Sequence, residues 1–272
     1  MKSVAYRRSI LEIIVRAGAG HTGSDLSCID ILNVLYNRIL RVTPERPYDP
    51  DRDRYIQSKG HAAEALYVVL ADRGFFPAAE LGTLYQEGTR LLGHPTRKVP
   101  GVEHNTGALG HGLSVAVGLA LAAKLSGRPY RVFALLGDGE LAEGSIWEAS
   151  LAAAHHRLDN LVAIVDRNTL QISGCTEVVC ALEPLEAKFA AFGYAVRSVN
   201  GHDLAALEGA LSAVPFASGR PSLLLARTTK GRGVSFMEGA PSWHHHVPSA
   251  AELALALAEL DDAATQLCTE AP

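Results

Sequence analysis

The chain has 272 residues, of which 48% are hydrophobic and 20% charged, with a net charge of −4 at pH 7. That length suffices for one α/β domain over residues 1–272, and the scattered Lys and Arg residues give no reason to expect a nucleic-acid partner. No apolar run reaches the ~18–20 residues of a membrane-spanning helix, and the four cysteines lack CxxC or zinc-ligand spacing, which predicts reduced thiols in the cytoplasm.

Helical and strand patterns alternate along the chain. In chain order they predict a helix over residues 3–17, a helix over about 25–40, a strand over 54–58, helices over 61–72, 77–87 and 113–125, a strand over 132–136, a helix over 143–156, a strand over 161–165, a helix over 181–192, a strand over 194–199, a helix over 204–214, a strand over 222–227 and a closing helix over 251–263. The last few residues are expected to fray. This alternation predicts an α/β fold with parallel strands.

The strand–helix–strand unit at the centre of the chain places two polar residues together. The first strand ends in Gly137-Asp138-Gly139, and the next ends in Asp166-Arg167-Asn168. Because both strands of such a unit point the same way, Asp138 and Asn168 should lie at one carboxyl edge of a parallel sheet, where open α/β sheets bind ligands.

Carboxylate and amide oxygens at this edge suit a hard cation such as Mg²⁺, with phosphate oxygens completing its coordination. Gly139, at the predicted start of the helix, would let backbone N–H groups approach a pyrophosphate. The alternative is an ordinary turn in which Asp138 only caps the helix. Asn168, at the end of the very next strand, favours the cation site.

Further motifs resemble those of the transketolase family, in the family's order and across nearly the full length. Beside the GDG turn and its Asn, which resemble the thiamine diphosphate signature, they are Gly20-His21-Thr22-Gly23, Ser58-Lys59-Gly60-His61-Ala62, Gly93-His94-Pro95, Asn105 to Gly112, Thr229-Lys230-Gly231-Arg232-Gly233 and Trp243-His244. The resemblance implies the thiamine diphosphate-binding fold, a mostly parallel central sheet with helices on both faces. It also implies the N-terminal, diphosphate-binding subunit of a split, two-subunit transketolase.

The resemblance assigns residues to the cofactor and its metal ion. It places His61 on the diphosphate, the backbone of Gly107 and Leu109 on the aminopyrimidine, and Ile172 on the thiazolium ring. The Leu170 carbonyl becomes the third protein ligand, after Asp138 and Asn168, of Mg²⁺ or another divalent cation such as Ca²⁺. From the residues alone, the glycines before the helix over 113–125 could equally let two helices pack closely. His111 departs from the Gln that many relatives carry.

The resemblance also assigns catalytic residues. His21 would face the reactive carbon of the cofactor, and His94 and His244 would meet the substrate. Glu143 and Glu148 would form an acidic relay at a subunit contact. As plain alternatives, His21 could be a solvated loop residue and the two glutamates a solvated helix face. The histidines that follow His244, His245 and His246, are expected to be structural, because neighbouring histidines rarely face one ion.

The expected function is transfer of a two-carbon ketol unit from a ketose to an aldose, and the sequence leaves open whether these sugars are phosphorylated. A partner subunit carrying the pyrimidine-binding domain would complete the site in an α2β2 assembly. Two alternatives remain, a subunit of another thiamine diphosphate enzyme, such as a decarboxylase or synthase, and a non-catalytic partner that retains the fold. His21, His61, His94 and His244 favour transketolase chemistry, and the intact Asp138 and Asn168 count against a non-catalytic remnant.

Overall fold

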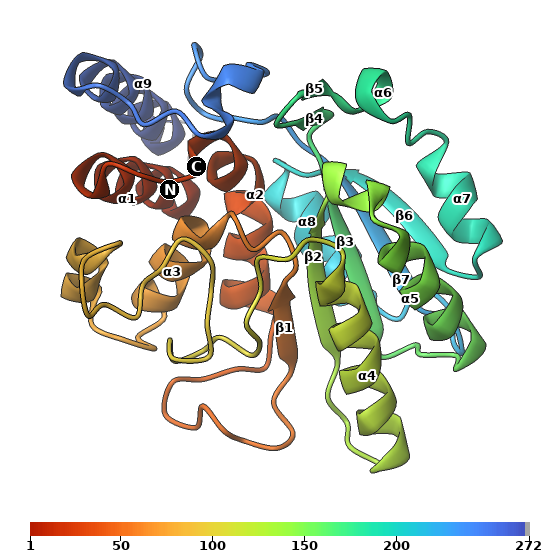
Figure 1. Ribbon diagram of the computed structural model, residues 1–272. Coiled ribbons are helices and arrows are strands. Elements are labelled where there is room, and N and C mark those ends of the chain that lie inside the picture. The colour runs from red at the N-terminus through yellow and green to blue at the C-terminus, as the bar shows by residue number, and fades with distance from the viewer. Residues whose placement is uncertain (270–272) are drawn as a thin grey trace.

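Five parallel strands form the central sheet of the computed structural model, which describes residues 1–269 (Figure 1). Residues 270–272, in the stretch expected to fray, lie outside the described residues. The strands are β1 (Arg54–Gln57), β2 (Val132–Gly137), β3 (Leu161–Arg167), β6 (Ala195–Asn200) and β7 (Ser222–Arg227), in the spatial order β1-β2-β3-β7-β6. The predicted parallel sheet is confirmed.

The sheet is covered on both faces, as expected. Helices α1 (Lys2–Ala17), α2 (Thr22–Val34), α3 (Ala63–Asp72) and α8 (Leu204–Ser212) pack on one face, and α4 (His111–Leu125), α5 (Gly144–His155) and α7 (Leu185–Ala191) pack on the other. Successive side chains of a strand point to opposite faces. Accordingly, Phe133 and Leu135 of β2 belong to the first core, whereas Val132, Ala134 and Leu136 belong to the second.

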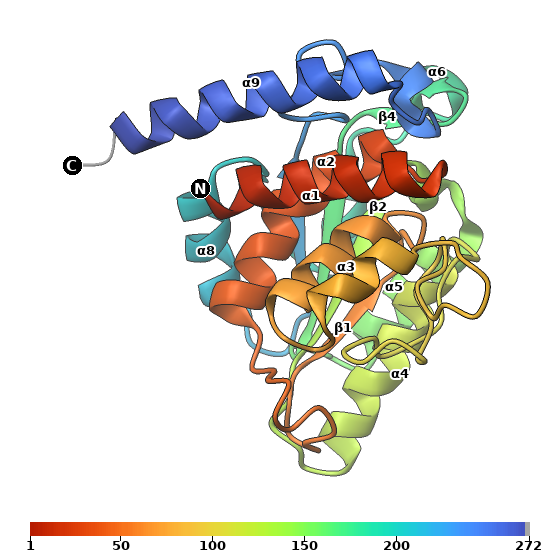
Figure 2. The ribbon, with the colours of Figure 1, turned by 90° about the vertical axis from the view of Figure 1, so that its left-hand side faces the viewer.

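Every residue of β2 and of β3 is buried, which explains their continuous apolar sequences. The closing helix is longer than predicted: α9 runs over Ala250–Thr269 and packs against α1 (Figure 2). Ala256 and Leu260 are its buried contacts. Among residues 1–269, no helix is long and apolar enough to cross a membrane.

Several predicted boundaries were wrong for identifiable reasons. The helix expected over 77–87 is only a 3₁₀ segment, η2 (Ala78–Thr83). The helix expected over 181–192 contains Pro184, whose ring and missing N–H exclude it from a helix interior. The structure has instead the short α6 (Thr176–Val179) and then α7, with Pro184 at the N-cap of α7.

Two other differences lie close to the sheet edge. The helix expected over 25–40 begins at Thr22 and continues beyond Val34 as a π-helix, η1 (Leu35–Ile39). A small antiparallel hairpin, β4 (Leu170–Gln171) and β5 (Gly174–Cys175), follows β3 and was not predicted. Strands of two residues are too short to show the alternation of apolar and polar residues from which strands are predicted.

Candidate active site

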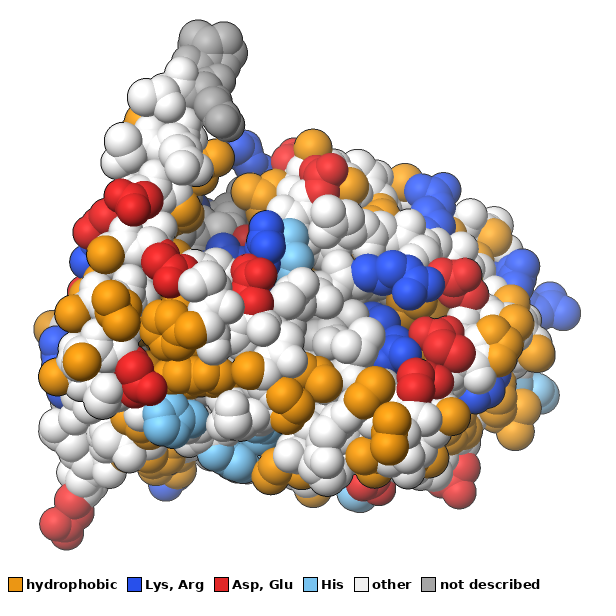
Figure 3. All heavy atoms as spheres, turned by 90° about the horizontal axis from the view of Figure 1, so that it is seen from above, with side chains coloured by type: hydrophobic (Ala, Val, Ile, Leu, Met, Phe, Trp, Pro, Cys, Tyr) orange, Lys and Arg blue, Asp and Glu red, His pale blue; other side chains and the backbone are white. Residues whose placement is uncertain are grey.

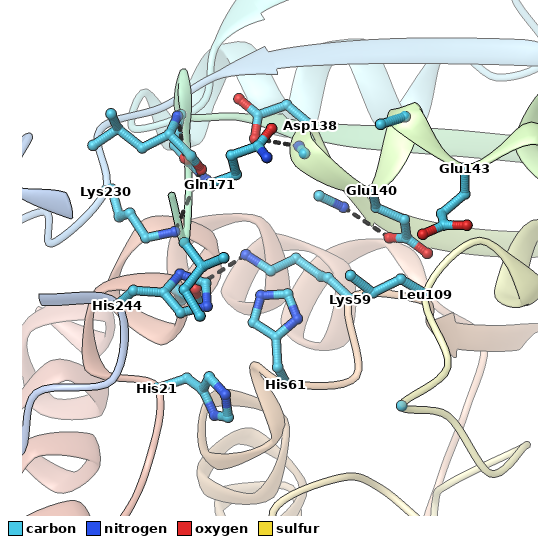
Figure 4. Close-up of a pocket in the computed structure, with 18 of the residues that line it drawn as sticks. His21, Lys59, His61, Leu109, Asp138, Glu140, Glu143, Gln171, Lys230 and His244 are labelled. Carbon is cyan, nitrogen blue, oxygen red and sulfur yellow. Dashed lines mark hydrogen bonds between the residues drawn. The ribbon is translucent and has the colours of Figure 1, made fainter. Parts of the chain in front are cut away.

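Four neighbouring strands end at the same edge of the sheet, and a polar residue that lines one cavity follows shortly after each. Lys59 follows β1, Asp138 follows β2, Asn168 follows β3 and Lys230 follows β7. The cavity has a volume of about 410 Å³. Figure 4 shows Lys59, Asp138 and Lys230 around it, together with His21, His61 and His244.

The structure brings together nearly all of the residues that the sequence predicts for the site. Those that line the cavity are His21, His61, His94, Gly107, Leu109, Asp138, Gly139, Glu143, Asn168, Leu170, Ile172 and His244. Glu148 is exposed on α5 and is not among the lining residues. Residues from loops far apart in the sequence therefore face one space.

The Asp138 carboxylate is held in place by its neighbours. It accepts hydrogen bonds from the backbone N–H groups of Gly139 (2.8 Å) and Thr169 (2.6 Å) and from the guanidinium of Arg167 (3.0 Å). A carboxylate has about four lone-pair sites, so one remains for a further partner. Burial and the nearby Asp166 carboxylate raise the pKa of Asp138, and a bound cation would favour its charged form.

Asn168 and the Leu170 carbonyl add two oxygen donors beside Asp138. The Asn168 amide donates to Asp166 (3.2 Å), and its oxygen accepts from the Leu170 backbone N–H (3.1 Å). The Leu170 carbonyl accepts from the Lys230 ammonium at 3.4 Å. Carboxylate, amide and carbonyl oxygens are the donors that hard cations take in proteins. The residues present therefore fit an ion such as Mg²⁺ or Ca²⁺.

Two lysines line the cavity. The Lys59 ammonium is buried and pairs with Asp166 at 2.5 Å. Burial alone would lower the pKa of Lys59, but the Asp166 carboxylate raises it above its usual range. Burial and the Lys59 charge lower the pKa of Lys230 to about 8, so Lys230 is still mostly charged at pH 7. These cations favour an anionic ligand such as a diphosphate.

The predicted histidines form a cluster on the other side of the cavity. The ring of His21 lies 5.3 Å from that of His61, 6.1 Å from that of His94 and 5.6 Å from that of His244. Burial lowers the pKa of His21 and of His244 to about 3, and it lowers the pKa of His61 well below its usual value. These rings are therefore neutral at pH 7. Within the described part of the chain, the Nδ1 atoms of His21 and His244 are buried and have no hydrogen-bond partner.

His245 joins this cluster, which the sequence analysis did not anticipate. Its ring lies 4.3 Å from that of His21 and 4.8 Å from that of His244. The expectation that adjacent histidines face apart fails here because the chain turns at the end of a 3₁₀ segment, η4 (Pro241–His244). His246 faces elsewhere, with its ring against Trp243 at 4.5 Å.

A buried glutamate that the sequence analysis missed orders the loops around the cavity. Glu140 accepts hydrogen bonds from the Ser58 hydroxyl (2.5 Å) and from the backbone N–H groups of Gly110 (2.9 Å) and Gly137 (3.0 Å). Burial raises the pKa of Glu140. The exposed Glu143 lies at the same end of the cavity (Figure 4). The GDGE sequence carries the only sequence signal for Glu140, a carboxylate two residues beyond a strand-end aspartate.

The prediction that Gly139 begins a helix was wrong. Gly139 starts a 3₁₀ segment, η3 (Gly139–Ala142), and α5 begins only at Gly144. A Cβ atom at Gly139 would lie 2.8 Å from the Cβ of Gln171 in β4, so close packing by the hairpin requires glycine here. Lys59 and Lys230 were quoted only as parts of motifs, and their positions just after strand ends could have marked them as site residues.

The fold and this cavity define a class of protein. Oxygen donors for a hard cation, buried lysines and neutral histidines meet at the carboxyl edge of an open parallel sheet. That combination is typical of α/β enzymes that hold a phosphorylated cofactor through a metal ion.

Comparisons with known proteins identify the family. Residues 2–261 match the family described as "Transketolase, thiamine diphosphate binding domain". The chain is 48% identical over 262 residues to one of the subunits of the apulose-4-phosphate transketolase of Phocaeicola vulgatus, covering 96% of this chain and 93% of that one. It is 42% identical to the SqwG subunit of the 6-deoxy-6-sulfo-D-fructose transketolase of a Clostridium strain, covering 94% and 93%.

A solved transketolase from Leishmania mexicana superposes with a TM-score of 0.90 at 32% identity, covering 95% of this chain and 40% of that one. The chain thus spans less than half of that enzyme's length, but it spans nearly the whole length of the relatives that are single subunits. The chain belongs to the transketolase family and contains its thiamine diphosphate-binding domain. Its fold is that of the transketolases.

Proposed function

We propose that this chain is the diphosphate-binding subunit of a two-subunit transketolase, which transfers a two-carbon ketol unit from a ketose to an aldose. The observation that carries the proposal is the cavity itself. It combines oxygen donors and lysine charges at one side with a cluster of neutral histidines at the other. Family membership and relatives that are named as transketolase subunits support the same assignment.

The residues present fit thiamine diphosphate bound through a metal ion. Asp138, Asn168 and the Leu170 carbonyl would hold Mg²⁺ or a similar ion such as Ca²⁺, because all three offer hard oxygen donors. Gly139 lies beside them in the turn after β2, and His61 would bond the diphosphate. The oxygen donors and Gly139 lie on one side of the cavity with the two lysines, and His61 belongs to the histidine cluster that faces them.

The organic half of the cofactor would lie against the apolar and glycine residues. Ile172 is 61% exposed although it is a large apolar residue, and a thiazolium ring would cover it. A Cβ atom at Gly107 would approach the His94 ring to 3.0 Å, and Gly107 has a φ of 138°. Only glycine lets this loop pass so close to His94, and its backbone and that of Leu109 are then open to the aminopyrimidine.

When bound, thiamine diphosphate supplies the nucleophilic carbon and the electron sink that carbon–carbon cleavage requires. The chain's own histidines handle the protons. His21 and His244 are neutral at pH 7, and their Nδ1 atoms have no hydrogen-bond partner within residues 1–269, so they can accept a proton from a sugar hydroxyl and return it to an alkoxide. His94 would orient the donor sugar, and Glu143 with Glu148 would form an acidic relay toward a neighbouring subunit.

The partner would be a C-terminal subunit that carries the pyrimidine-binding domain, in an α2β2 assembly. Support comes from the relatives named as single transketolase subunits, which this chain matches over nearly their whole length. The relatives' names mention a sugar phosphate and a sulfonated sugar, so we infer a ketose with an anionic end as donor. The proposal includes one domain over residues 1–272. It also includes a place in the cytoplasm, because the four cysteines, all within residues 1–269, are unpaired as in a reducing compartment.

The test of the cofactor site is the substitution Asp138→Ala, measured with Mg²⁺ and thiamine diphosphate on the chain together with its partner. Loss of a charged metal ligand should weaken Mg²⁺-dependent cofactor binding by at least about tenfold, because mutation of a residue that only orients a metal ligand already lowers metal affinity by about 10- to 100-fold. The matched control is Asp262→Ala, an exposed aspartate on α9, which should bind as the parent does. Parent-like cofactor affinity in Asp138→Ala would refute the assignment.

A further inference from the structure

We propose that His21, His244 and His245 form a second metal site, selective for a transition-metal ion of the Zn²⁺ class, at the rim of the cavity. Each residue offers one imidazole nitrogen, and the three nitrogens lie within 4.8 Å of one another. His21 and His244 line the cavity, whereas His245 is exposed. The site is built from the residue that precedes α2 and from the C-terminal end of η4, and it shares no residue with the oxygen donors of Asp138, Asn168 and Leu170.

The side chains can close around an ion without moving the backbone far. Nitrogen ligands of a tetrahedral Zn²⁺ stand about 3.3 Å apart, given Zn–N bonds of about 2.0–2.1 Å. The three nitrogens lie within 4.8 Å of one another, so binding an ion would require the side chains to approach by up to about 1.5 Å. The Nδ1 atoms of His21 and His244 are buried and have no partner within residues 1–269, so coordination would break no existing hydrogen bond at those atoms.

The chemistry of the ligands decides which ion is bound. Imidazole nitrogens suit Zn²⁺, Cu²⁺ and Ni²⁺, whereas Mg²⁺ takes oxygen ligands. Three protein ligands leave a fourth position for water or another ligand. Resting on the proposed function, we infer that an ion here occupies the two histidines that would meet the sugar, so it would compete with substrate and inhibit the enzyme.

The experiment uses the full chain, made without a histidine tag and stripped of metal with a chelator. Calorimetric titration with Zn²⁺ in the presence of excess Mg²⁺ should show one tight equivalent per chain. In His245→Ala the Zn²⁺ affinity should fall by at least about tenfold. Mutation of a residue that only orients a metal ligand already lowers metal affinity by about 10- to 100-fold. The matched control is the adjacent His246→Ala, which removes an exposed histidine whose ring packs on Trp243 instead and should leave the affinity unchanged.

Two further arms keep the outcome decisive. His245→Gln retains a similar volume without an imidazole, and thermal unfolding of each variant checks that it is folded. Asp138→Ala separates this inference from the proposed cofactor site, because it should lose Mg²⁺ but keep the tight Zn²⁺. The inference is overturned if the parent binds no tight Zn²⁺, if both His245 variants keep it, or if only Asp138→Ala loses it. In the last case Zn²⁺ occupies the oxygen-donor site, which leaves the proposed function standing.

Discussion

At the scale of single residues, the histidines of the cavity differ in what lies next to them. His61 lies two residues after Lys59, between β1 and α3, whereas His244 is the last residue of η4 and has an Nδ1 atom with no hydrogen-bond partner within residues 1–269. We therefore assign His61 to the cofactor's diphosphate and His244 to proton transfer during the reaction. The two assignments predict opposite kinetic effects.

Substituting His244 by Ala should lower kcat by about 10²- to 10⁴-fold, the usual contribution of a general acid–base group, while cofactor affinity changes little. Substituting His61 by Ala should instead weaken thiamine diphosphate binding by about 10- to 100-fold, since a hydrogen bond to a charged group is worth about 1.5–3 kcal/mol. Steady-state assays at saturating cofactor, with the partner present, separate the two effects. If His244→Ala lost the cofactor yet turned over normally once saturated, the roles would be reversed.

The sequence could predict most residues of the cavity because strand ends in a parallel sheet meet at one edge. Asp138 and Asn168 follow from that rule alone, and the family motifs supply the histidines. Glu140 and His245 could not be placed in this way, because their side-chain directions depend on the 3₁₀ segments η3 and η4. No periodic pattern reports the geometry of such short turns.

At the scale of elements, close contacts between loops shape the cavity. Gly60, after β1, packs against the loop that precedes α4: a Cβ atom there would lie 2.6 Å from the Thr106 hydroxyl and 2.8 Å from the backbone nitrogen of Gly107. The backbone nitrogen cannot move aside as a flexible side chain can. The two loops must therefore shift apart if residue 60 carries a side chain.

Gly60→Ala should destabilise the fold by about 1–3 kcal/mol, as overpacking usually does, and should also weaken cofactor binding because Gly107 is displaced. The control is Gly118→Ala, in the exposed part of α4, where a Cβ atom meets nothing within 4 Å. That change should stabilise the chain by about 0.5–1 kcal/mol. Chemical denaturation and cofactor titration of both variants provide the measurement, and equal behaviour of the two would contradict this account of the loop contact.

Elements with strong patterns were predicted well and short ones were not. The buried strands β2 and β3 and the amphipathic α1 carry long, regular signals, so their positions were found within a few residues. The helix expected over 181–192 failed because Pro184 was overlooked as a boundary. The hairpin β4–β5, which carries Leu170, packs closely against the turn at Gly139, and its strands are too short to show a periodic pattern.

At the scale of the whole molecule, the cavity opens on a face that also exposes apolar side chains. Figure 3 looks onto the carboxyl edge of the sheet, where hydrophobic side chains form a band beside the histidines. Ile172 and Val178, from the hairpin region and α6, are 61% and 84% exposed. A partner that covers this face would complete the cavity, and obligate interfaces of that kind commonly bury about 2,000 Å² or more.

The composition and motifs predicted the α/β class and the family, but a single sequence cannot show which surface a partner covers. Such a surface shows only when the exposure of each apolar side chain, such as Ile172 and Val178, is known. Within residues 1–269, the cavity is lined by the oxygen donors and lysines that we propose for the cation and the diphosphate, and we assign the carboxylate that meets the aminopyrimidine to the partner.

The most direct test of this account is an assay of the purified chain alone for two-carbon transfer between a ketose with an anionic end and an aldose, with thiamine diphosphate and Mg²⁺ in excess. The split-enzyme account predicts no transfer above the buffer blank from the lone chain, and activity once a pyrimidine-domain subunit is added. Robust transfer by the lone chain would contradict it.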